Sequence, residues 1–214
     1  MAWADAFRDQ SVLVTGASSG IGRATAVAFA AAGARVALVA RRRPQLDEVA
    51  AEVAAAGGRA LVVPTDVTDR GAVADCFATV VRAHGGVDVV VNGAGVLVPG
   101  PVATLRDEDL DAMLRVNLFG ALFVMQEAMT HMRPRGAGVI VNVASLAGRR
   151  GVSPLGGYCA TKFALIGLTE ALRSELHGGP VHVGLVLPGV VDTPMVDAAM
   201  QDPDFLALWP PALS

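Results

Sequence analysis

Several residue types are scarce in this chain, and the scarcity of each type argues against one class of protein. The two cysteines, Cys76 and Cys159, have no CxxC spacing, which argues against a disulfide framework or a zinc motif and favours reduced thiols. Cys159 is expected to be a small packing residue. The four histidines are scattered without metal-ligand spacing, so we expect no metal site.

Long hydrophobic runs are also missing, although 53% of the residues are hydrophobic. Residues 24–40 come closest to a membrane span, but Gly33 and Arg35 interrupt them where a helix would pass into a strand. Residues 1–9 carry acids and lack the apolar segment of a signal peptide. The net charge of −3 provides no basic face for nucleic acid. We therefore expect a cytoplasmic enzyme or binding protein that folds as one domain, 1–214, has no membrane span and binds no nucleic acid.

What the chain does contain is a regular alternation of apolar runs and helical segments. Strands are expected at 12–14, 35–40, 60–63, 87–91, 138–143 and 181–187. Helices are expected at 23–32, 44–56, 69–84, 107–132 and 157–177. Continuous Val/Leu runs between helices predict an α/β fold of three layers, with helices on both faces of a parallel sheet. Right-handed crossovers make this a doubly wound, Rossmann-like sheet that binds ligands at the carboxyl ends of its strands.

A glycine-rich turn directly follows the first expected strand. Gly16, Gly20 and Gly22 lie between the strand at 12–14 and the helix at 23–32. Glycines allow close approach of the backbone to a ligand, and the free N–H groups at a helix start bind phosphate. Because the turn stands between a strand and a helix, it indicates dinucleotide binding.

The only tyrosine and the only lysine, Tyr158 and Lys162, lie four residues apart. Residues at this spacing are neighbours on one face of a helix. An ammonium at ~4 Å and an effective dielectric of ~20 would stabilise the phenolate by ~4 kcal/mol, or about three pKa units. The pair therefore predicts a tyrosine that acts as general acid/base with a lowered pKa. A surface lysine beside an ordinary helix tyrosine is the alternative.

These motifs form an ordered set along the chain. They are Thr15-Gly16-x-x-x-Gly20-Ile21-Gly22, Asn92-x-Ala94-Gly95, Ser145 and Tyr158-x-x-x-Lys162. The set resembles the short-chain dehydrogenase/reductase family, of the compact single-domain kind, over residues 11–193. Ser145 precedes Tyr158 by thirteen residues, which is the family's spacing. Gly93 stands where the family more often has a second asparagine.

The resemblance implies hydride transfer between a nicotinamide ring and an alcohol or carbonyl carbon. Tyr158 would exchange the hydroxyl proton, Lys162 would lower the pKa of this tyrosine and hold the nicotinamide ribose, and Ser145 would bond the substrate oxygen. Asn117 would complete the catalytic set by holding a water between Lys162 and solvent, with a buried structural amide as the alternative. The expected cofactor-binding residues are Gly16, Ser18, Ser19, Gly20, Ile21, Gly22, Arg41, Arg42, Asp66, Val67, Asn92, Ala94, Gly95, Tyr158, Lys162, Pro188, Gly189, Val191 and Thr193.

The residues after the second expected strand indicate the cofactor. Proteins of this fold that prefer NAD carry an acid at the strand end, where it binds the ribose hydroxyls. Here the strand ends at Ala40 and is followed by Arg41 and Arg42. Guanidinium groups bind phosphate as a fork, so NADP(H) is favoured over NAD(H). A solvated basic loop is the alternative.

The substrate is expected to be a small uncharged or apolar carbonyl or alcohol, because the candidate pocket residues carry no charge. These candidates are Val96, Leu97, Val98, Leu146, Val152, Pro154, Leu155, Val190 and Met195. Residues 195–214 are expected to form a substrate loop, with Phe205, Leu206, Leu208 and Trp209 as a helical lid or the start of a core. The family usually adds a seventh strand, so we expect either a fragment or an edge at the sixth strand that something else covers.

The helices at 107–132 and 157–177 are hydrophobic on nearly all sides. One stripe of each covers the sheet and the other needs a partner, which favours a homodimer or homotetramer. Two other functions remain open. One is an epimerase or dehydratase that uses the same Tyr/Lys pair, and the other is a cofactor-binding sensor or scaffold without turnover.

Overall fold

Six parallel strands form one sheet in the computed structural model, which describes residues 6–209. The strands are β1 (Ser11–Thr15), β2 (Arg35–Ala40), β3 (Arg59–Pro64), β4 (Val89–Asn92), β5 (Gly138–Val143) and β6 (Val181–Val186). Their order across the sheet is β3-β2-β1-β4-β5-β6, so the direction of winding reverses between β1 and β4. This is the expected doubly wound, Rossmann-like sheet. The ends of the expected domain 1–214 and of the expected loop 195–214 lie outside the described residues.

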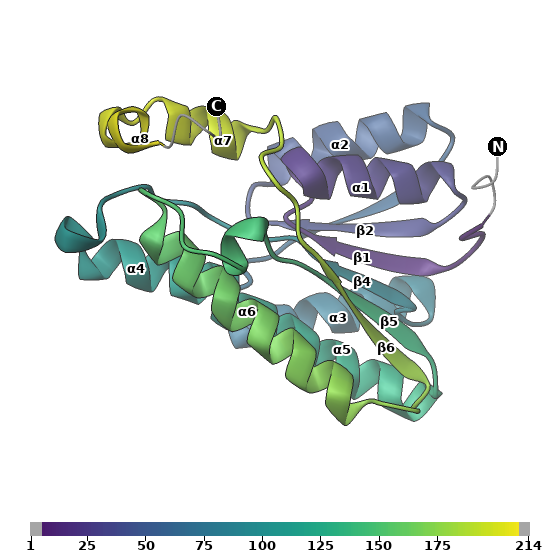
Figure 1. Ribbon diagram of the computed structural model, residues 1–214. Coiled ribbons are helices and arrows are strands. Elements are labelled where there is room, and N and C mark those ends of the chain that lie inside the picture. The colour runs from purple at the N-terminus through teal and green to yellow at the C-terminus, as the bar shows by residue number, and fades with distance from the viewer. Residues whose placement is uncertain (1–5, 210–214) are drawn as a thin grey trace.

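Helices cover both faces of the sheet, as Figure 1 shows. One face carries α1 (Gly20–Ala31) and α2 (Arg43–Ala55), and the other carries α3 (Arg70–His84), α4 (Asp107–Leu114), α5 (Ala121–Arg135) and α6 (Gly156–Glu175). Short 3₁₀ turns lie at Val102–Thr104 and Leu146–Gly148. Two further helices, α7 (Pro194–Met200) and α8 (Pro203–Leu208), extend from β6 across the end of the sheet.

Successive side chains of a strand point to opposite faces of the sheet, so the hydrophobic core is divided into two parts, one on each face. In β1, Val12 and Val14 pack with the α1/α2 layer, whereas Leu13 packs with residues of α3, α5 and α6. All three side chains are fully buried. Burial on both faces explains why the strands read as continuous apolar runs.

The helix expected at 107–132 is interrupted. It consists of α4, a π-helical segment at Arg115–Gly120 and α5, which continues to Arg135. A π-helical turn adds one residue without changing the apolar character of the segment, so the periodicity could not reveal it. Such turns are rare and are often found at functional sites. Asn117 lies within this one.

The sheet ends at β6, which pairs with β5 alone among the described strands. Val139 of β5 and Val186 of β6 are 37% and 46% exposed. The expectation of six strands is therefore confirmed for residues 6–209, and the expectation that something else covers the edge at the sixth strand stays a prediction. Across the same residues, no helix is long and apolar enough to span a membrane.

Candidate active site

A large cavity of about 1110 Å³ opens at the carboxyl ends of the strands. Segments far apart in the sequence line it: the turn between β1 and α1, the loops after β2, β3, β4 and β5, the first turns of α6, and the segment from 188 to 209. The reversal of the strand order between β1 and β4 separates the loops at this end and leaves the crevice between them.

The glycine turn starts α1 three residues earlier than expected, at Gly20. Ser19 precedes the helix with extended backbone, and its side chain caps no N–H group. Gly16 and Gly20 have φ values of 69° and 51°, a region that side chains disfavour. A Cβ atom on Gly22 would lie 2.2 Å from the Gly16 carbonyl oxygen, so only glycine fits. The turn thus presents open N–H groups to the cavity, as phosphate binding requires.

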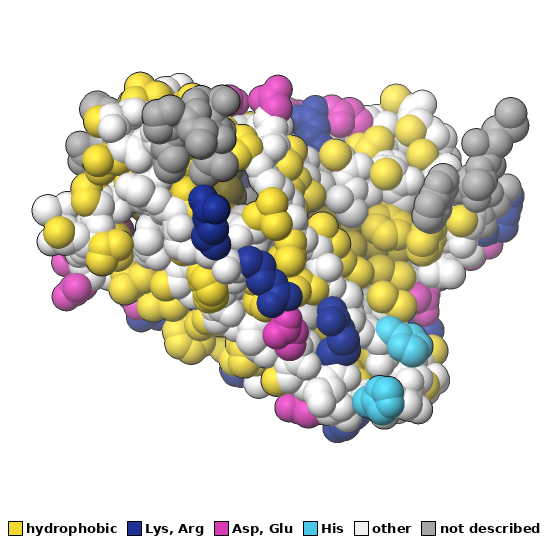
Figure 2. Space-filling model, viewed as in Figure 1, with side chains coloured by type: hydrophobic (Ala, Val, Ile, Leu, Met, Phe, Trp, Pro, Cys, Tyr) yellow, Lys and Arg dark blue, Asp and Glu magenta, His cyan; other side chains and the backbone are white. Residues whose placement is uncertain are grey.

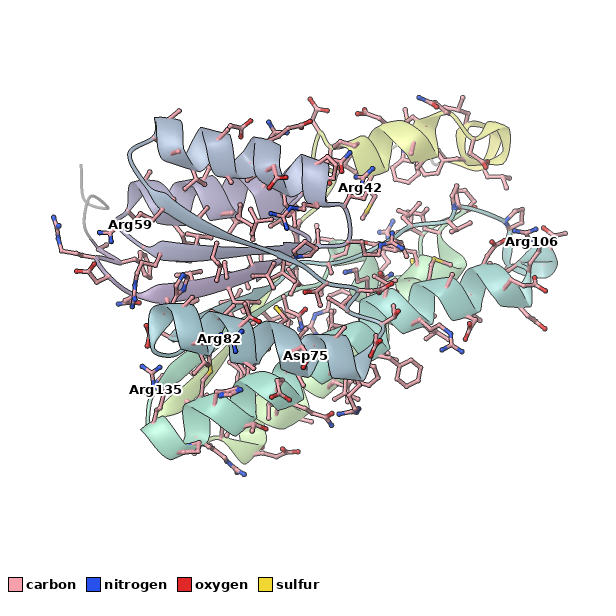
Figure 3. All side chains as sticks on the ribbon, turned by 180° about the vertical axis from the view of Figure 1, so that it is seen from behind. Arg42, Arg59, Asp75, Arg82, Arg106 and Arg135 are labelled. Atoms are coloured by element: carbon pink, nitrogen blue, oxygen red, sulfur yellow. The ribbon has the colours of Figure 1, made fainter. Side chains whose placement is uncertain are left out.

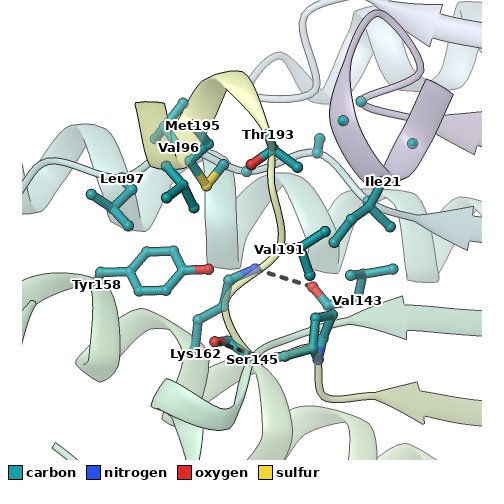
Figure 4. A pocket seen from close by; sticks show the side chains of 18 of the residues that line it. Ile21, Val96, Leu97, Val143, Ser145, Tyr158, Lys162, Val191, Thr193 and Met195 are labelled. Carbon is teal, nitrogen blue, oxygen red and sulfur yellow. Dashed lines mark hydrogen bonds between the residues drawn. The ribbon is translucent and has the colours of Figure 1, made fainter. Parts of the chain in front are cut away.

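Tyr158, Lys162 and Ser145 meet on the wall of this cavity (Figure 4). Tyr158 and Lys162 stand on successive turns of α6. Ser145 lies two residues after the end of β5 and directly precedes the short 3₁₀ turn Leu146–Gly148. The Lys162 Nζ atom donates to the Val143 carbonyl oxygen at 3.1 Å and lies 5.6 Å from the Tyr158 ring centroid. The alternative of a surface lysine is excluded, because Lys162 is only 4% exposed.

Burial dominates the protonation equilibria of this pair. It lowers the pKa of Lys162 from 10.5 to about 8 and raises the pKa of Tyr158 above its ordinary value. Ser145 acts in the opposite direction on the Tyr158 pKa, but the net shift is upward. The expected net lowering of the Tyr158 pKa is therefore wrong for the protein without ligands, since removal of the phenolate from water outweighs its neighbours.

Asn117 lies behind the cavity wall and is fully buried. Its Oδ1 atom accepts from Val96 N at 2.8 Å, and its Nδ2 atom donates to Val96 O at 2.9 Å and to Thr161 Oγ1 at 3.0 Å. Both amide protons are therefore used within the protein, as in the structural alternative. These bonds connect the loop after β4 to α6 one residue before Lys162.

Asn92 is not on the cavity lining, and its expected contact with the cofactor stays a prediction. It is the last residue of β4 and its side chain points into the helical layer, where Nδ2 donates to Ala121 O at 2.9 Å. Thr15 donates to Asn92 Oδ1 at 3.2 Å and accepts from Gly93 N and Ala94 N. Asn92 therefore shapes the loop that lines the site rather than facing the site itself.

Arg41 and Arg42 lie at the end of β2, exposed and on the cavity lining. Figure 3 shows Arg42 at the end of the molecule where α7 lies, opposite Arg59 and Arg135. Burial acts to raise the pKa of the neighbouring Asp66, but hydrogen bonds from Thr68 and the charge of Arg41 lower it overall. A guanidinium and a carboxylate thus face the same part of the cavity.

The expected substrate contacts are partly found. Val98 and Pro154 do not line the cavity, and Leu206 and Leu208 of the expected lid are 56% and 42% exposed. The other expected pocket residues do line it, together with Phe205 and Trp209, whose rings stack at 4.7 Å.

Sequence reasoning also missed residues on the lining. The missed residues include Thr65, Arg149, Arg150, Ala199 and Met200. The two arginines correct the expectation of an uncharged lining. The signal that could have indicated these arginines is their position in the sequence, four and five residues after Ser145.

A doubly wound sheet with a glycine turn, a buried lysine and a tyrosine at its carboxyl edge defines the class of nicotinamide-dependent oxidoreductases. The chain belongs to the short-chain dehydrogenase family, whose family model, described as short chain dehydrogenase, matches residues 10–204. It is therefore a dehydrogenase/reductase that acts on CH–OH groups with NAD(P). Among residues 6–209, no cluster of His, Cys, Asp or Glu could hold a metal ion.

Similar proteins differ in substrate and cofactor. A sorbitol dehydrogenase from Cereibacter sphaeroides is 38% identical over 86% of this chain and 71% of its own length. The structure of an actinorhodin polyketide ketoreductase with NADPH has a TM-score of 0.87 and 36% identity, covering 90% of this chain and 74% of that one. An NAD⁺-bound xylitol dehydrogenase has a TM-score of 0.87 and 33% identity, covering 92% and 75%.

Proposed function

We propose that this protein is an NADP(H)-dependent oxidoreductase that interconverts an alcohol and a carbonyl, with Tyr158 as general acid/base. The observation that carries the proposal is the placement of Tyr158 and Ser145 on the same cavity as the open start of α1. The bound dinucleotide supplies hydride chemistry at its nicotinamide ring. The residues of the chain orient the reactants and move the proton.

Tyr158 gives a proton to the carbonyl oxygen during reduction and takes it back during oxidation. Ser145 donates a hydrogen bond to the same oxygen, where charge develops. The Ser145 Oγ atom accepts from Ala147 N at 3.1 Å, which fixes its position. The raised pKa of Tyr158 in the protein without ligands suits proton donation, and positive charge near the phenol when ligands are bound would lower it.

Lys162 holds the ribose of the cofactor and supplies positive charge beside Tyr158. Asn117 is proposed to position it, because its bonds to Val96 and Thr161 fix the loop after β4 against α6. A water on Oδ1 would use the acceptor capacity that the bond from Val96 N leaves free. The catalytic set is thus Asn117, Ser145, Tyr158 and Lys162.

The dinucleotide would lie along the carboxyl edge of the sheet. Gly16, Ser18, Ser19, Gly20, Ile21 and Gly22 would hold its pyrophosphate, and Asp66 with Val67 would flank the adenine. The loop after β4 would contribute Ala94 and Gly95, and the segment after β6 would contribute Pro188, Gly189, Val191 and Thr193. All of these residues line the one cavity, whose volume of about 1110 Å³ is sufficient for a cofactor and a small substrate.

Arg41 and Arg42 support the preference for NADP(H). Neither arginine forms an ion pair with a described residue, so their guanidinium groups can bind the 2′-phosphate. The β2 strand ends at Ala40 and offers no carboxylate to the ribose hydroxyls.

The reacting part of the substrate is proposed to be small and apolar. Around Tyr158, the buried cluster contains Met113, Leu155, Cys159, Ala199 and Phe205. Such surroundings favour an uncharged carbonyl or alcohol at the reacting end and exclude water from it. The segment from about 195 onward is proposed as the substrate loop of a single domain that spans 1–214.

The proposal is tested by following absorbance of the reduced cofactor with a panel of carbonyls and alcohols and with both cofactors. Tyr158→Phe should lower kcat by at least about 10²-fold, because general acid/base catalysis is lost. The variant should still bind NADPH, since the phenol is not the main cofactor contact. Unchanged turnover in the variant would contradict the mechanism. Binding of NADPH without turnover of any substrate would favour a sensor or scaffold.

The surface of the π-helical segment Arg115–Gly120 and of α6 suggests self-association. Phe119 and Phe163 are 46% and 45% exposed on the two expected helices, 107–132 and 157–177. We propose that these faces join copies of the chain in a homodimer or homotetramer. The cytoplasmic location expected from the sequence remains a prediction.

A further inference from the structure

Two neighbouring arginines on the cavity lining differ in their contacts. Arg149 and Arg150 follow the short turn Leu146–Gly148, and both line the cavity that contains Ser145 and Tyr158. The Arg149 Nη2 atom donates to Glu170 Oε1 at 2.7 Å, which neutralises its charge against α6. Arg150 is exposed and has no hydrogen bond or ion pair with any residue in 6–209. Figure 2 shows a row of basic side chains on this face along α6, starting below α7 and α8.

The charge balance of the cavity leaves Arg150 without a counterion. Among the residues that the structure describes, Asp66 is the only acid on the lining, and it already accepts two hydrogen bonds from Thr68 at the end proposed to hold the adenine. Lys162, the remaining cation near Tyr158, is buried and bonded to Val143. The substrate side of the cavity therefore offers one free guanidinium to an anion.

The loop that carries Arg150 is fixed to the catalytic helix. The Val152 carbonyl oxygen accepts from Leu155 N at 2.7 Å, immediately before α6 begins, and lies 4.0 Å from Cys159 Sγ. Val152 and Trp209 pack against the buried cluster that contains Tyr158 and Phe205. Arg150 thus belongs to a loop fixed to α6, and it lines the same cavity as Tyr158.

We propose that Arg150 is a specificity-determining residue that binds an anionic group, a carboxylate or phosphate, at the end of the substrate remote from the reacting carbonyl. This inference rests on the proposed function and refines its substrate class to oxo compounds with an apolar body and an anionic end. A guanidinium binds both kinds of oxyanion as a fork. The reacting end remains uncharged, as the surroundings of Tyr158 require.

The test compares medium-chain oxo acids, which carry a methyl ketone at the far chain end, with their methyl esters at saturating NADPH. The wild type should show about tenfold higher kcat/KM for an acid of matching length than for its ester, and rising salt should reduce the difference. Arg150→Gln should remove this preference by raising KM for the acid about tenfold, with kcat within about twofold. Arg149→Gln, which removes the same charge from the adjacent paired arginine, should retain the preference.

Equal kcat/KM for acids and esters in the wild type would overturn the inference while the proposed function stands. So would equal losses for acid and ester in Arg150→Gln, or the same loss of preference in Arg149→Gln. If no carbonyl is turned over, the proposed function fails separately. Calorimetric binding of octanoate to the NADPH complex then decides the role of Arg150, since equal affinity in wild type and Arg150→Gln would overturn it.

Discussion

At the scale of single residues, the burial of Tyr158 and Lys162 matters as much as their spacing. The Lys162 ammonium reaches one carbonyl oxygen, that of Val143, and is otherwise enclosed in protein. An enclosed cation is costly when unpaired, so burial lowers the pKa of Lys162 and the charged form destabilises the folded protein. The site is thus destabilised by the group that its proposed chemistry requires, which is a common property of functional sites.

The pH dependence of stability should reveal this cost. The pKa of Lys162 is about 8 in the folded protein and 10.5 ordinarily, so between these values the unfolded chain binds more protons and stability rises with pH. Below about pH 8 the full penalty, of order 3 kcal/mol, is present. Lys162→Met should therefore unfold at higher urea concentration than the wild type near neutral pH, with a difference that narrows towards about pH 10.

The comparison isolates Lys162, because Tyr158 and Cys159 are present in both proteins. Urea unfolding of the cofactor-free proteins at several pH values gives the two free energies of unfolding. A difference that does not change between about pH 7 and pH 10 would contradict the lowered pKa of Lys162.

At the scale of elements, the junctions at the carboxyl ends of the strands determine what is bound. The β1 to α1 junction presents N–H groups, and the β2 to α2 junction presents Arg41 and Arg42. The π-helical turn between α4 and α5 places Asn117 against the loop after β4. Each junction is short, so its residues have little freedom to move away from the cavity.

The β2 to α2 junction should control the choice of cofactor. Arg41→Asp replaces a phosphate-binding cation by an acid, and kcat/KM with NADPH should fall about 10- to 100-fold, as expected for the loss of one charge-assisted hydrogen bond. The value with NADH should be retained or rise, which inverts the preference. Steady-state kinetics with both cofactors measures the effect.

Arg43→Asp provides the matched control. Arg43 directly follows Arg42 in the sequence. Its Nε atom lies 3.6 Å from Asp47 Oδ2, and it does not line the cavity. Its replacement should leave the ratio of the two kcat/KM values unchanged. An unaltered preference in Arg41→Asp would argue for a solvated basic loop.

At the scale of the whole molecule, the sheet buries its centre and leaves some apolar surface at its margin. β6 is an edge among the described strands, with Val186 46% exposed. Exposed phenylalanines lie in the π-helical segment Arg115–Gly120 and in α6. Apolar surface of this kind is typical of contacts between chains.

Charged residues at this surface should dissociate the protein. The wild type is expected to sediment as a dimer or tetramer, and the double variant Phe119→Glu/Phe163→Glu should sediment as a smaller species, because burial of an unpaired carboxylate is unfavourable. Leu206→Glu, at an exposed leucine of α8, should leave the assembly intact. A monomeric wild type would refute the proposed contact.

Much of the fold was determined by the sequence alone, because its signals are local. Apolar runs and helical segments predicted all six strands, and the strand–turn–helix arrangement predicted a glycine turn that leads directly into a helix. The spacing of Tyr158, Lys162 and Ser145 sufficed to bring them to one cavity, since it depends on one helix and the strand beside it.

Only the tertiary structure decided which side chains face the cavity and how far each of them is buried from water. It turned Asn92 into the helical layer, placed Arg150 on the cavity lining and buried Asn117 between two segments. It also reversed the expected shift of the Tyr158 pKa. The reason is physical: the spacing along the chain sets the neighbours of a residue within one element, whereas desolvation depends on elements that pack from elsewhere in the chain.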